Sequence, residues 1–222
     1  MSTGLQLQKT HPAAALPVMV FLPGGAFVLA SGDNYDPSRL AWTQDVLVVT
    51  VNYRLGAFGF LAHPALRRES VTGGSANFGL LDQQAALRWV QWNIAAFGGN
   101  PRKVTLFGES AGAWSACYQA VSSTARVLFQ RVIFESGSCT DMRSLVSARE
   151  ADQGGIAFSK KLECENVVDV LGCLRRIPTS SIARALAARC GVCSANSEKA
   201  QRSLWPNIPS KLMDRRVLLT QQ

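Results

Sequence analysis

Residues 104–112 read Val-Thr-Leu-Phe-Gly-Glu-Ser-Ala-Gly, a hydrophobic, β-branched run that ends in the pattern Gly-x-Ser-x-Gly. The run is typical of a buried strand, and the residues that follow, 111–121, are typical of a helix. A chain that passes directly from a strand into a helix turns sharply, so the residues two places before and after the serine must be small. Gly108 and Gly112 meet this requirement, and the turn lifts the Ser110 hydroxyl off the predicted sheet.

A serine at such a turn has the position that a nucleophile requires. Backbone N–H groups at the start of the following helix point toward the space above the hydroxyl, where they would stabilise the negative charge on an acyl oxygen. Gly-x-Ser-x-Gly alone is a weak pattern. The strand before it and the helix after it favour a catalytic Ser110 over a chance turn.

A second hydrophobic segment, residues 17–22, breaks at the adjacent glycines Gly24 and Gly25. Adjacent glycines allow successive N–H groups to turn toward one point, because no Cβ obstructs them. In a serine hydrolase such a loop supplies the remaining donors to the oxyanion. The alternative is an ordinary glycine turn after a buried strand, and this segment taken alone favours that alternative.

The order of segments predicts an α/β fold with a mostly parallel sheet covered by helices. We expect strands near residues 18–23, 46–52, 103–108 and 131–135, and helices near 77–97, 111–121, 148–162, 166–175 and 179–189. Asn77 is a candidate cap for the first of these helices. Its apolar residues recur at helical spacing, so we expect them to face the core; they are Phe78, Leu81, Ala85, Trp89 and Trp92.

Further blocks lie at residues 46–54, 56–61, 76–83 and 97–101. In order and spacing, these blocks, the glycine loop and the serine turn resemble the type B carboxylesterases, which include the cholinesterases and some fungal lipases. The resemblance covers roughly residues 15–190 and implies a partial α/β-hydrolase fold. Residues 1–14 and about 192–222 match poorly, so we expect a single incomplete domain over 1–222, truncated at both ends.

The resemblance implies a serine carboxylesterase that acts on small-molecule carboxylic esters through an acyl-enzyme, with Ser110 as nucleophile and with no cofactor or metal. It implies oxyanion-hole N–H groups from Gly25, Ala26 and Ala111, and supporting roles for Gly24, Glu109 and Ser136. Three positions depart from the family pattern. Pro23 replaces a histidine or aromatic residue, Ala26 replaces a third glycine, and Trp114 replaces a small residue. The donors are backbone groups and survive these changes, whereas Trp114 either narrows the acyl pocket or packs in the core.

The triad acid and the histidine are not evident in this chain. In this fold both follow the serine, but the two histidines, His11 and His63, precede Ser110. No downstream acid lies in a block that resembles the family's acid loop. A serine without an adjacent base is a poor nucleophile at neutral pH, so we do not expect the chain alone to be active. A non-catalytic binding or adhesion relative with an unknown protein partner, and an inactive fragment, remain as alternatives.

Six cysteines are present. Cys164 and Cys173 match a family disulfide, which implies an oxidising compartment for the parent protein. Cys117 is expected to be a buried thiol. Cys190 and Cys193 have the spacing of half a zinc site or of a redox pair, but no second ligand pair accompanies them.

The net charge of +8 comes from scattered cations without interleaved aromatic residues, which favours a solvated surface over a nucleic-acid site. No apolar stretch is long enough to cross a bilayer. No signal peptide is visible at the start of the sequence.

Overall fold

The computed structural model describes residues 4–6, 15–70, 74–140, 146–187 and 217–219. Residues 1–53, 80–141 and 210–222 form one compact unit, and residues 54–79 and 142–209 form a second. The first unit holds the sheet and the second is helical. That the whole chain forms one incomplete domain stays a prediction.

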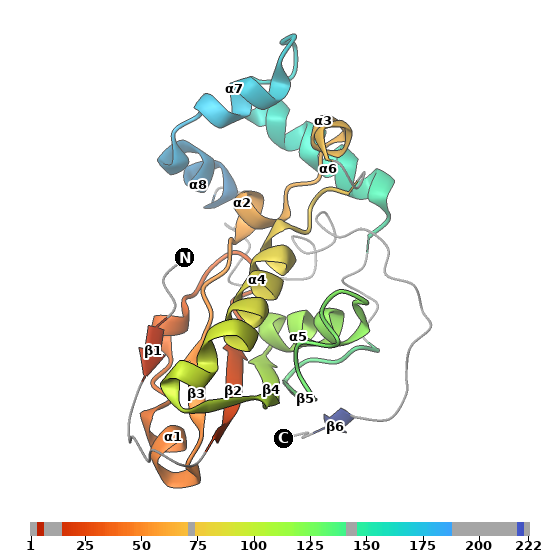
Figure 1. Ribbon diagram of the computed structural model, residues 1–222. Helices are drawn as coiled ribbons and strands as arrows, with labels where there is room; N and C mark the ends of the chain where they lie inside the picture. Colours follow the sequence, from red (N-terminus) through yellow and green to blue (C-terminus); the bar gives the residue numbers. More distant parts are fainter. Residues whose placement is uncertain (1–3, 7–14, 71–73, 141–145, 188–216, 220–222) are drawn as a thin grey trace. The chain divides into compact units, whose positions relative to one another are not determined.

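The sheet has the strand order β1-β3-β2-β4-β5-β6 (Figure 1). The strands are β1 (Gly4–Gln6), β2 (Leu16–Leu22), β3 (Leu47–Thr50), β4 (Gly99–Glu109), β5 (Arg131–Glu135) and β6 (Val217–Leu219). β1 is antiparallel to β3, and all the other neighbouring pairs are parallel. The predicted mostly parallel α/β sheet is therefore confirmed. β4 begins earlier than expected, at Gly99, because Leu16 pairs with Gly99 before a shift in register at Val18.

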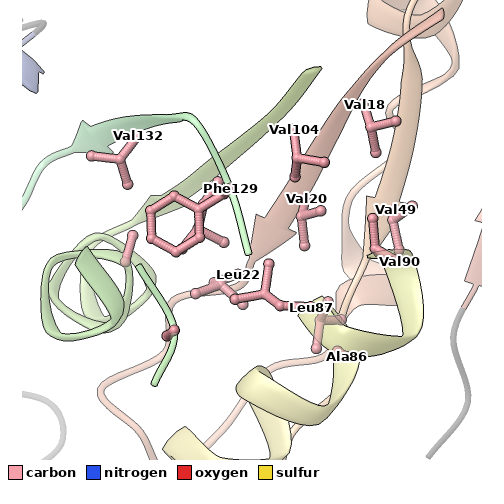
Figure 2. Close-up of a cluster of buried hydrophobic side chains, with 14 of the residues drawn as sticks. Val18, Val20, Leu22, Val49, Ala86, Leu87, Val90, Val104, Phe129 and Val132 are labelled. Atoms are coloured by element: carbon pink, nitrogen blue, oxygen red, sulfur yellow. The ribbon is translucent and has the colours of Figure 1, made fainter. Parts of the chain in front are cut away.

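Alternate residues of the strands face opposite sides of the sheet, so β2 contributes to two clusters of buried side chains. On one side, Val18, Val20 and Leu22 join a large core with residues of β3, β4 and β5. Figure 2 shows this core, with side chains of the helix α4 (Phe78–Asn93) lying against those of the strands. On the other side, Phe21 packs with Val48 and Phe107. The helix α5 (Ala111–Val121) also contributes buried residues to the larger core.

α4 forms where it was expected, and Trp89 packs against the core as expected, but the predicted inner face was wrong at two other positions. Leu81 is 50% exposed and Trp92 is 77% exposed. The buried face instead carries Leu87 and Val90 together with the polar side chains of Gln83 and Gln84. Glutamines interrupt the hydrophobic pattern of the inner face, and Leu81 and Trp92 add apolar residues to the outer side, so the apolar periodicity misplaced part of the face.

The predicted cap of α4 was also wrong. The side-chain oxygen of Asn77 is buried and accepts no hydrogen bond from any residue that the structure describes. An N-cap side chain would accept one from a backbone N–H in the first turn of the helix.

Two substitutions test the revised face of α4. Leu87→Ala should lower the free energy of unfolding by about 2–5 kcal/mol, because it removes a fully buried side chain and leaves a cavity. Trp92→Ala should change it by no more than about 0.5 kcal/mol, because the side chain lies largely in solvent. Urea unfolding followed by circular dichroism measures both. A larger loss for Trp92→Ala than for Leu87→Ala would contradict this orientation.

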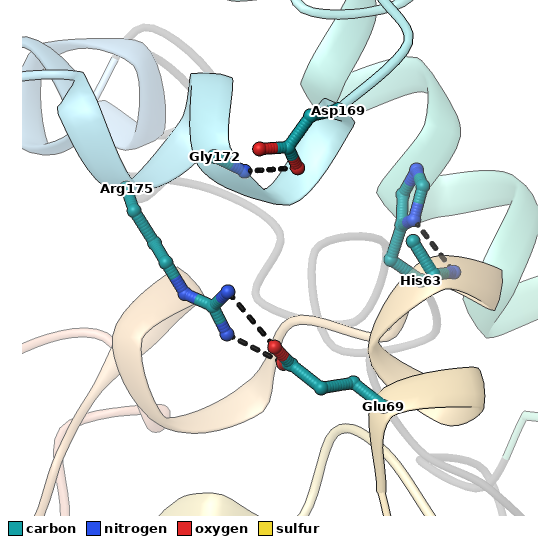
Figure 3. A network of polar contacts seen from close by, with 6 residues as sticks. His63, Glu69, Asp169, Gly172 and Arg175 are labelled. Carbon is teal, nitrogen blue, oxygen red and sulfur yellow. Dashed lines mark hydrogen bonds and ion pairs between the residues drawn. The ribbon is translucent and has the colours of Figure 1, made fainter.

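The second unit contains α2 (Gly56–Phe60), α3 (Pro64–Glu69), α6 (Ala148–Lys161), α7 (Val170–Arg176) and α8 (Thr179–Ala187). α6 packs closely against the chain just before α3, because a Cβ at Gly155 would lie 1.6 Å from the carbonyl oxygen of Ala62. Arg67 and Asp152 join the same two helices by an ion pair of 2.7 Å. Figure 3 shows a second ion pair, between Glu69 and Arg175, which links α3 to α7.

α7 begins later than expected because Asp169 caps it. The Asp169 carboxylate accepts a hydrogen bond of 2.7 Å from the backbone N–H of Gly172 (Figure 3). An acceptor at this position satisfies a donor in the first turn, which has no partner within the helix. The helix therefore starts at Val170 and not near residue 166.

Two disulfides are present among the described residues. Cys164 is paired with Cys173, as the resemblance implies. The expected thiol at Cys117 was wrong, because Cys117 is paired with Cys139. The chain after β5 returns to α5, which brings Cys139 to Cys117. A Cβ at Gly137 would lie 2.7 Å from the Cβ of Ala113 on α5. Cys190 and Cys193 lie outside the described residues.

No helix within the described ranges combines the length and apolar character needed to cross a membrane.

His63 caps α3 and is only 7% exposed. Its Nδ1 accepts a hydrogen bond of 3.1 Å from the backbone N–H of Ala65 (Figure 3), so this nitrogen carries no proton. Burial lowers the pKa of His63; the Asp152 carboxylate raises it, and the charge of Arg68 lowers it. The net effect is a pKa below the ordinary value of 6.5.

This cap makes stability depend on pH. Because the pKa is lower in the folded than in the unfolded protein, the unfolded state binds more protons as pH falls below about 6.5. The contribution of His63 to the free energy of unfolding is therefore fully present above that pH and declines as pH falls toward the folded pKa. His63→Asn keeps a capping acceptor that does not titrate, so its melting temperature should fall less between about pH 7.5 and 5.5. Equal declines in the two proteins would show that His63 does not control this loss.

Candidate active site

Ser110 occupies the turn between β4 and α5 in an unusual backbone conformation, with φ 53° and ψ −117°. Such a conformation is costly for a residue with a side chain and persists only where the surroundings enforce it. Here the Ser110 N–H donates to the carbonyl oxygen of Glu135 at 2.8 Å, and the Ser110 carbonyl oxygen accepts from the N–H of Trp114 at 3.1 Å. The end of β5 and the first turn of α5 thus hold the turn from both sides.

Close backbone contacts explain the two glycines of Gly-x-Ser-x-Gly. A Cβ at Gly112 would lie 1.9 Å from the carbonyl oxygen of Leu22, at the end of β2. A Cβ at Gly108 would lie 2.4 Å from the Gly112 backbone and 2.8 Å from the Leu22 carbonyl oxygen. Contacts this short leave no space for a side chain, so the turn forms only with glycine at both positions.

The Ser110 hydroxyl is not used to stabilise the helix. Serine at an N-cap commonly accepts a hydrogen bond from the first turn, but Ser110 makes no such side-chain bond to α5. Since this is the usual role of a serine at a helix start, its absence leaves the hydroxyl available for another function.

The glycine loop after β2 lies against this turn. A Cβ at Gly24 would lie 2.8 Å from the Glu109 carbonyl oxygen, 2.8 Å from a Glu109 carboxylate oxygen and 3.3 Å from the Ser110 Cβ. The next three residues, Gly25, Ala26 and Phe27, have positive φ values of 95°, 53° and 61°. The loop therefore coils tightly beside Ser110, as the adjacent glycines predict.

The backbone N–H groups that we predict as oxyanion donors are not used in hydrogen bonds to other described residues. The Gly25 carbonyl oxygen accepts from the N–H groups of Val28 at 3.0 Å and Leu29 at 3.1 Å, which closes the loop. By contrast, no described residue accepts a hydrogen bond from the backbone N–H groups of Gly25, Ala26 or Ala111. These are the donors that a serine hydrolase would direct at its substrate.

Two residues that the sequence analysis did not single out hold the ends of this loop. The Tyr53 hydroxyl donates to the Pro23 carbonyl oxygen at 2.8 Å, where the loop begins. The Asn52 side-chain oxygen accepts from the N–H of Gly32 at 2.7 Å, where the loop ends. Both residues lie two or three positions after the end of β3. Their place after a strand was the only signal in the sequence, and it does not reveal which distant carbonyl or N–H they bind.

The other predicted site residues lie around the turn. Ser136 follows β5 with φ 54°, next to the Glu135 carbonyl that binds Ser110, but no described residue bonds to its hydroxyl. Trp114 stacks on Phe27 of the glycine loop, with ring centroids 6.5 Å apart. Trp114 thus packs beside the loop and is half-buried.

No described residue forms a hydrogen bond with the Ser110 hydroxyl, so no general base is identified among them. His11 lies outside them, and the Nδ1 of His63 is occupied in capping α3. No group of three or more histidine, cysteine, aspartate or glutamate side chains within the described ranges is arranged to hold a metal ion. The absence of a metal or cofactor stays a prediction.

A comparison with protein families matches residues 6–218 to the carboxylesterase family. The chain belongs to the carboxylesterase family. The match extends further toward both ends than the motifs that carry the resemblance in the sequence. Together with the glycine loop and the turn at Ser110, it identifies the sheet as part of an α/β-hydrolase fold.

Curated relatives within the carboxylesterase family include esterases and cholinesterases. The para-nitrobenzyl esterase of Bacillus subtilis (strain 168) is 52% identical over 133 residues, which are 59% of this chain and 26% of that protein. The acetylcholinesterase of Bungarus fasciatus is 44% identical over 163 residues, 72% of this chain and 26% of that protein. Cholinesterase 2 of Branchiostoma lanceolatum is 41% identical over 170 residues, 74% of this chain and 49% of that protein. The chain thus spans between 26% and 49% of the length of these relatives.

Paired glycine substitutions test the close packing at the turn. Gly112→Ala should lower the free energy of unfolding by about 3 kcal/mol or more, because the new Cβ overlaps the end of β2 and the backbones must separate. Gly98→Ala is the matched control, since no atom lies within 4 Å of its Cβ position. It should cost only about 1–2 kcal/mol, for its positive φ. Urea unfolding measures both, and equal losses would contradict the contact between Leu22 and Gly112.

Proposed function

We propose that this chain carries the nucleophile and the oxyanion hole of a carboxylic ester hydrolase. The observation that supports this most directly is the enforced conformation of Ser110, whose hydroxyl does not cap α5 and which lies beside a loop with unused N–H groups. Strained backbone conformations that the surroundings enforce cluster at active sites. Membership of the carboxylesterase family makes the ester the expected substrate.

In this proposal the Ser110 Oγ attacks the ester carbonyl carbon and forms a C–O bond. The carbonyl π electrons move to its oxygen, which accepts hydrogen bonds from the N–H groups of Gly25, Ala26 and Ala111. A general base takes the hydroxyl proton and returns it to the departing alcohol as the ester C–O bond breaks. Water then cleaves the acyl-enzyme by the same steps. No base of this kind is found in the described residues, so we assign it to a part of the protein outside them.

The same site favours small acyl groups in this proposal. Trp114 and Phe27 stack at a ring-centroid distance of 6.5 Å, on two segments that border Ser110. Large rings here leave less space for the acyl chain than the small residue usual at the position of Trp114. We also infer that the protein matures in an oxidising compartment, because two disulfides join its described residues.

Labelling with an alkyl fluorophosphonate tests the nucleophile. In the reaction the Ser110 oxygen bonds to phosphorus, fluoride leaves, and the hydroxyl proton passes to free imidazole, which replaces the missing base. The oxyanion hole and substrate binding together retain about 10³–10⁴-fold catalysis in serine hydrolases that lack a triad member. Ser110 should therefore react at least about 100-fold faster than an ordinary serine, as measured by peptide mass spectrometry.

Ser123 is the matched reference, because it is an exposed serine of the same chain. Ser110→Ala should remove the fast label, and Ser123→Ala should leave it intact. If Ser110 and Ser123 react at equal rates, the turn is not a working nucleophile site. The binding relative or the inactive fragment would then be the better interpretation.

A further inference from the structure

Buried polar side chains connect the glycine loop to the helix that begins at Ser110. Tyr53 is 7% exposed, and its hydroxyl hydrogen is directed at the Pro23 carbonyl oxygen, 2.8 Å away. Burial raises the pKa of Tyr53 far above its ordinary value, so the phenol stays a neutral donor at every physiological pH. Pro23 has no N–H, and its buried carbonyl at the strand end depends on this bond.

Ser115 connects Tyr53 to α5. Its side chain is hydrogen-bonded to the Tyr53 hydroxyl. Because the single hydrogen of Tyr53 is used on Pro23, the Ser115 hydroxyl must be the donor in this contact. Ser115 lies on α5, little more than one turn beyond Ser110, and is fully buried. The bond therefore joins the two halves of the proposed oxyanion hole, the loop with Gly25 and Ala26 and the helix start with Ala111.

The chain of hydrogen bonds continues in one direction behind Ser115. Its oxygen accepts from Gln83 Nε2 at 3.0 Å, whose Oε1 accepts from Gln119 Nε2 at 2.9 Å. The Gln119 Oε1 accepts from Gln84 Nε2 at 3.1 Å. Every donor in this series is aligned toward Pro23, and aligned hydrogen bonds in a buried site strengthen one another. The Ser115 hydroxyl is thereby fixed by a network that spans α4 and α5.

We propose that Tyr53 is a positioning residue of the esterase site, which with Ser115 sets the position of the Gly25 and Ala26 N–H groups relative to that of Ala111. This inference rests on the proposed function. Tyr53 does not touch the substrate; it acts through the Pro23 carbonyl, two residues before Gly25. Displacement of catalytic groups by about 1 Å costs up to 10²-fold in rate. A loosened loop therefore weakens stabilisation of the transition state while substrate binding is retained.

Tyr53→Phe removes only the hydroxyl. In the fluorophosphonate reaction of the full chain, we expect its maximal labelling rate at Ser110 to fall about tenfold, with the half-saturating reagent concentration within about twofold of the original. Ser115→Ala keeps the bond from Tyr53 to Pro23 and should give a smaller fall, of about threefold. All proteins are measured at one temperature, well below the lowest of their melting temperatures, so that each is folded and the reaction itself is compared under the same conditions.

Tyr35→Phe is the matched control, because it makes the same chemical change at an exposed tyrosine. It should leave the labelling rate unchanged. A second readout is hydrogen–deuterium exchange over residues 24–29, which should accelerate in Tyr53→Phe and not in Tyr35→Phe. An unchanged labelling rate in folded Tyr53→Phe, or a rate change equal to that of Tyr35→Phe, would overturn the inference.

The two proposals fail in different ways. If Ser110 of the unmodified chain shows no preferential labelling, the proposed function fails, and exchange in the loop then decides whether Tyr53 positions it. Faster exchange in Tyr53→Phe supports the positioning role, and unchanged exchange overturns it. If Tyr53→Phe does not fold, Ser115→Ala decides by the same two readouts.

Discussion

The contact between the end of β2 and the start of α5 is the constraint on which the site depends. The Leu22 carbonyl oxygen approaches Gly112 so closely that neither Gly112 nor Gly108 has space for a Cβ. This contact brings three backbone segments together at one edge of the sheet. It forces Ser110 into its strained conformation and places the glycine loop beside it. A substitution that separates these segments would change the turn, the loop and the predicted donors together.

Polar groups, as well as apolar packing, connect this constraint to the rest of the first unit. The Ser110 backbone is bound by the Glu135 carbonyl of β5, and the loop is bound at its two ends by residues that follow β3. Gln119 of α5 donates a hydrogen bond to Gln83 of α4, which links the two helices close to the start of α5. Buried polar groups are costly unless they are satisfied, so such a network favours one geometry over its alternatives. That rigidity is what an oxyanion hole requires, because its donors must be in place before charge develops.

The sheet and the turn could be predicted because local patterns determine them. Residues 104–112 combine a hydrophobic strand with glycines at the two positions that a sharp turn demands, and the parallel order follows from alternating strands and helices. The inner face of α4 could not be predicted in the same way, because Gln83 and Gln84 are buried and Trp92 is exposed, which is the reverse of the usual pattern. The bond from Tyr53 to Pro23 joins residues 30 positions apart, and the pairing of Cys117 with Cys139 depends on the return of the chain after β5. Such contacts depend on tertiary structure and have no local signature.

A crystal structure of the chain phosphonylated at Ser110 would test the central claim most directly. The adduct places a phosphoryl oxygen where the oxyanion of the tetrahedral intermediate would lie. We expect that oxygen within about 3.1 Å of the backbone nitrogens of Gly25, Ala26 and Ala111, the distance at which such donors act. A phosphoryl oxygen directed to solvent, with these three nitrogens unbound, would contradict the claim that the loop and the helix start form one oxyanion hole.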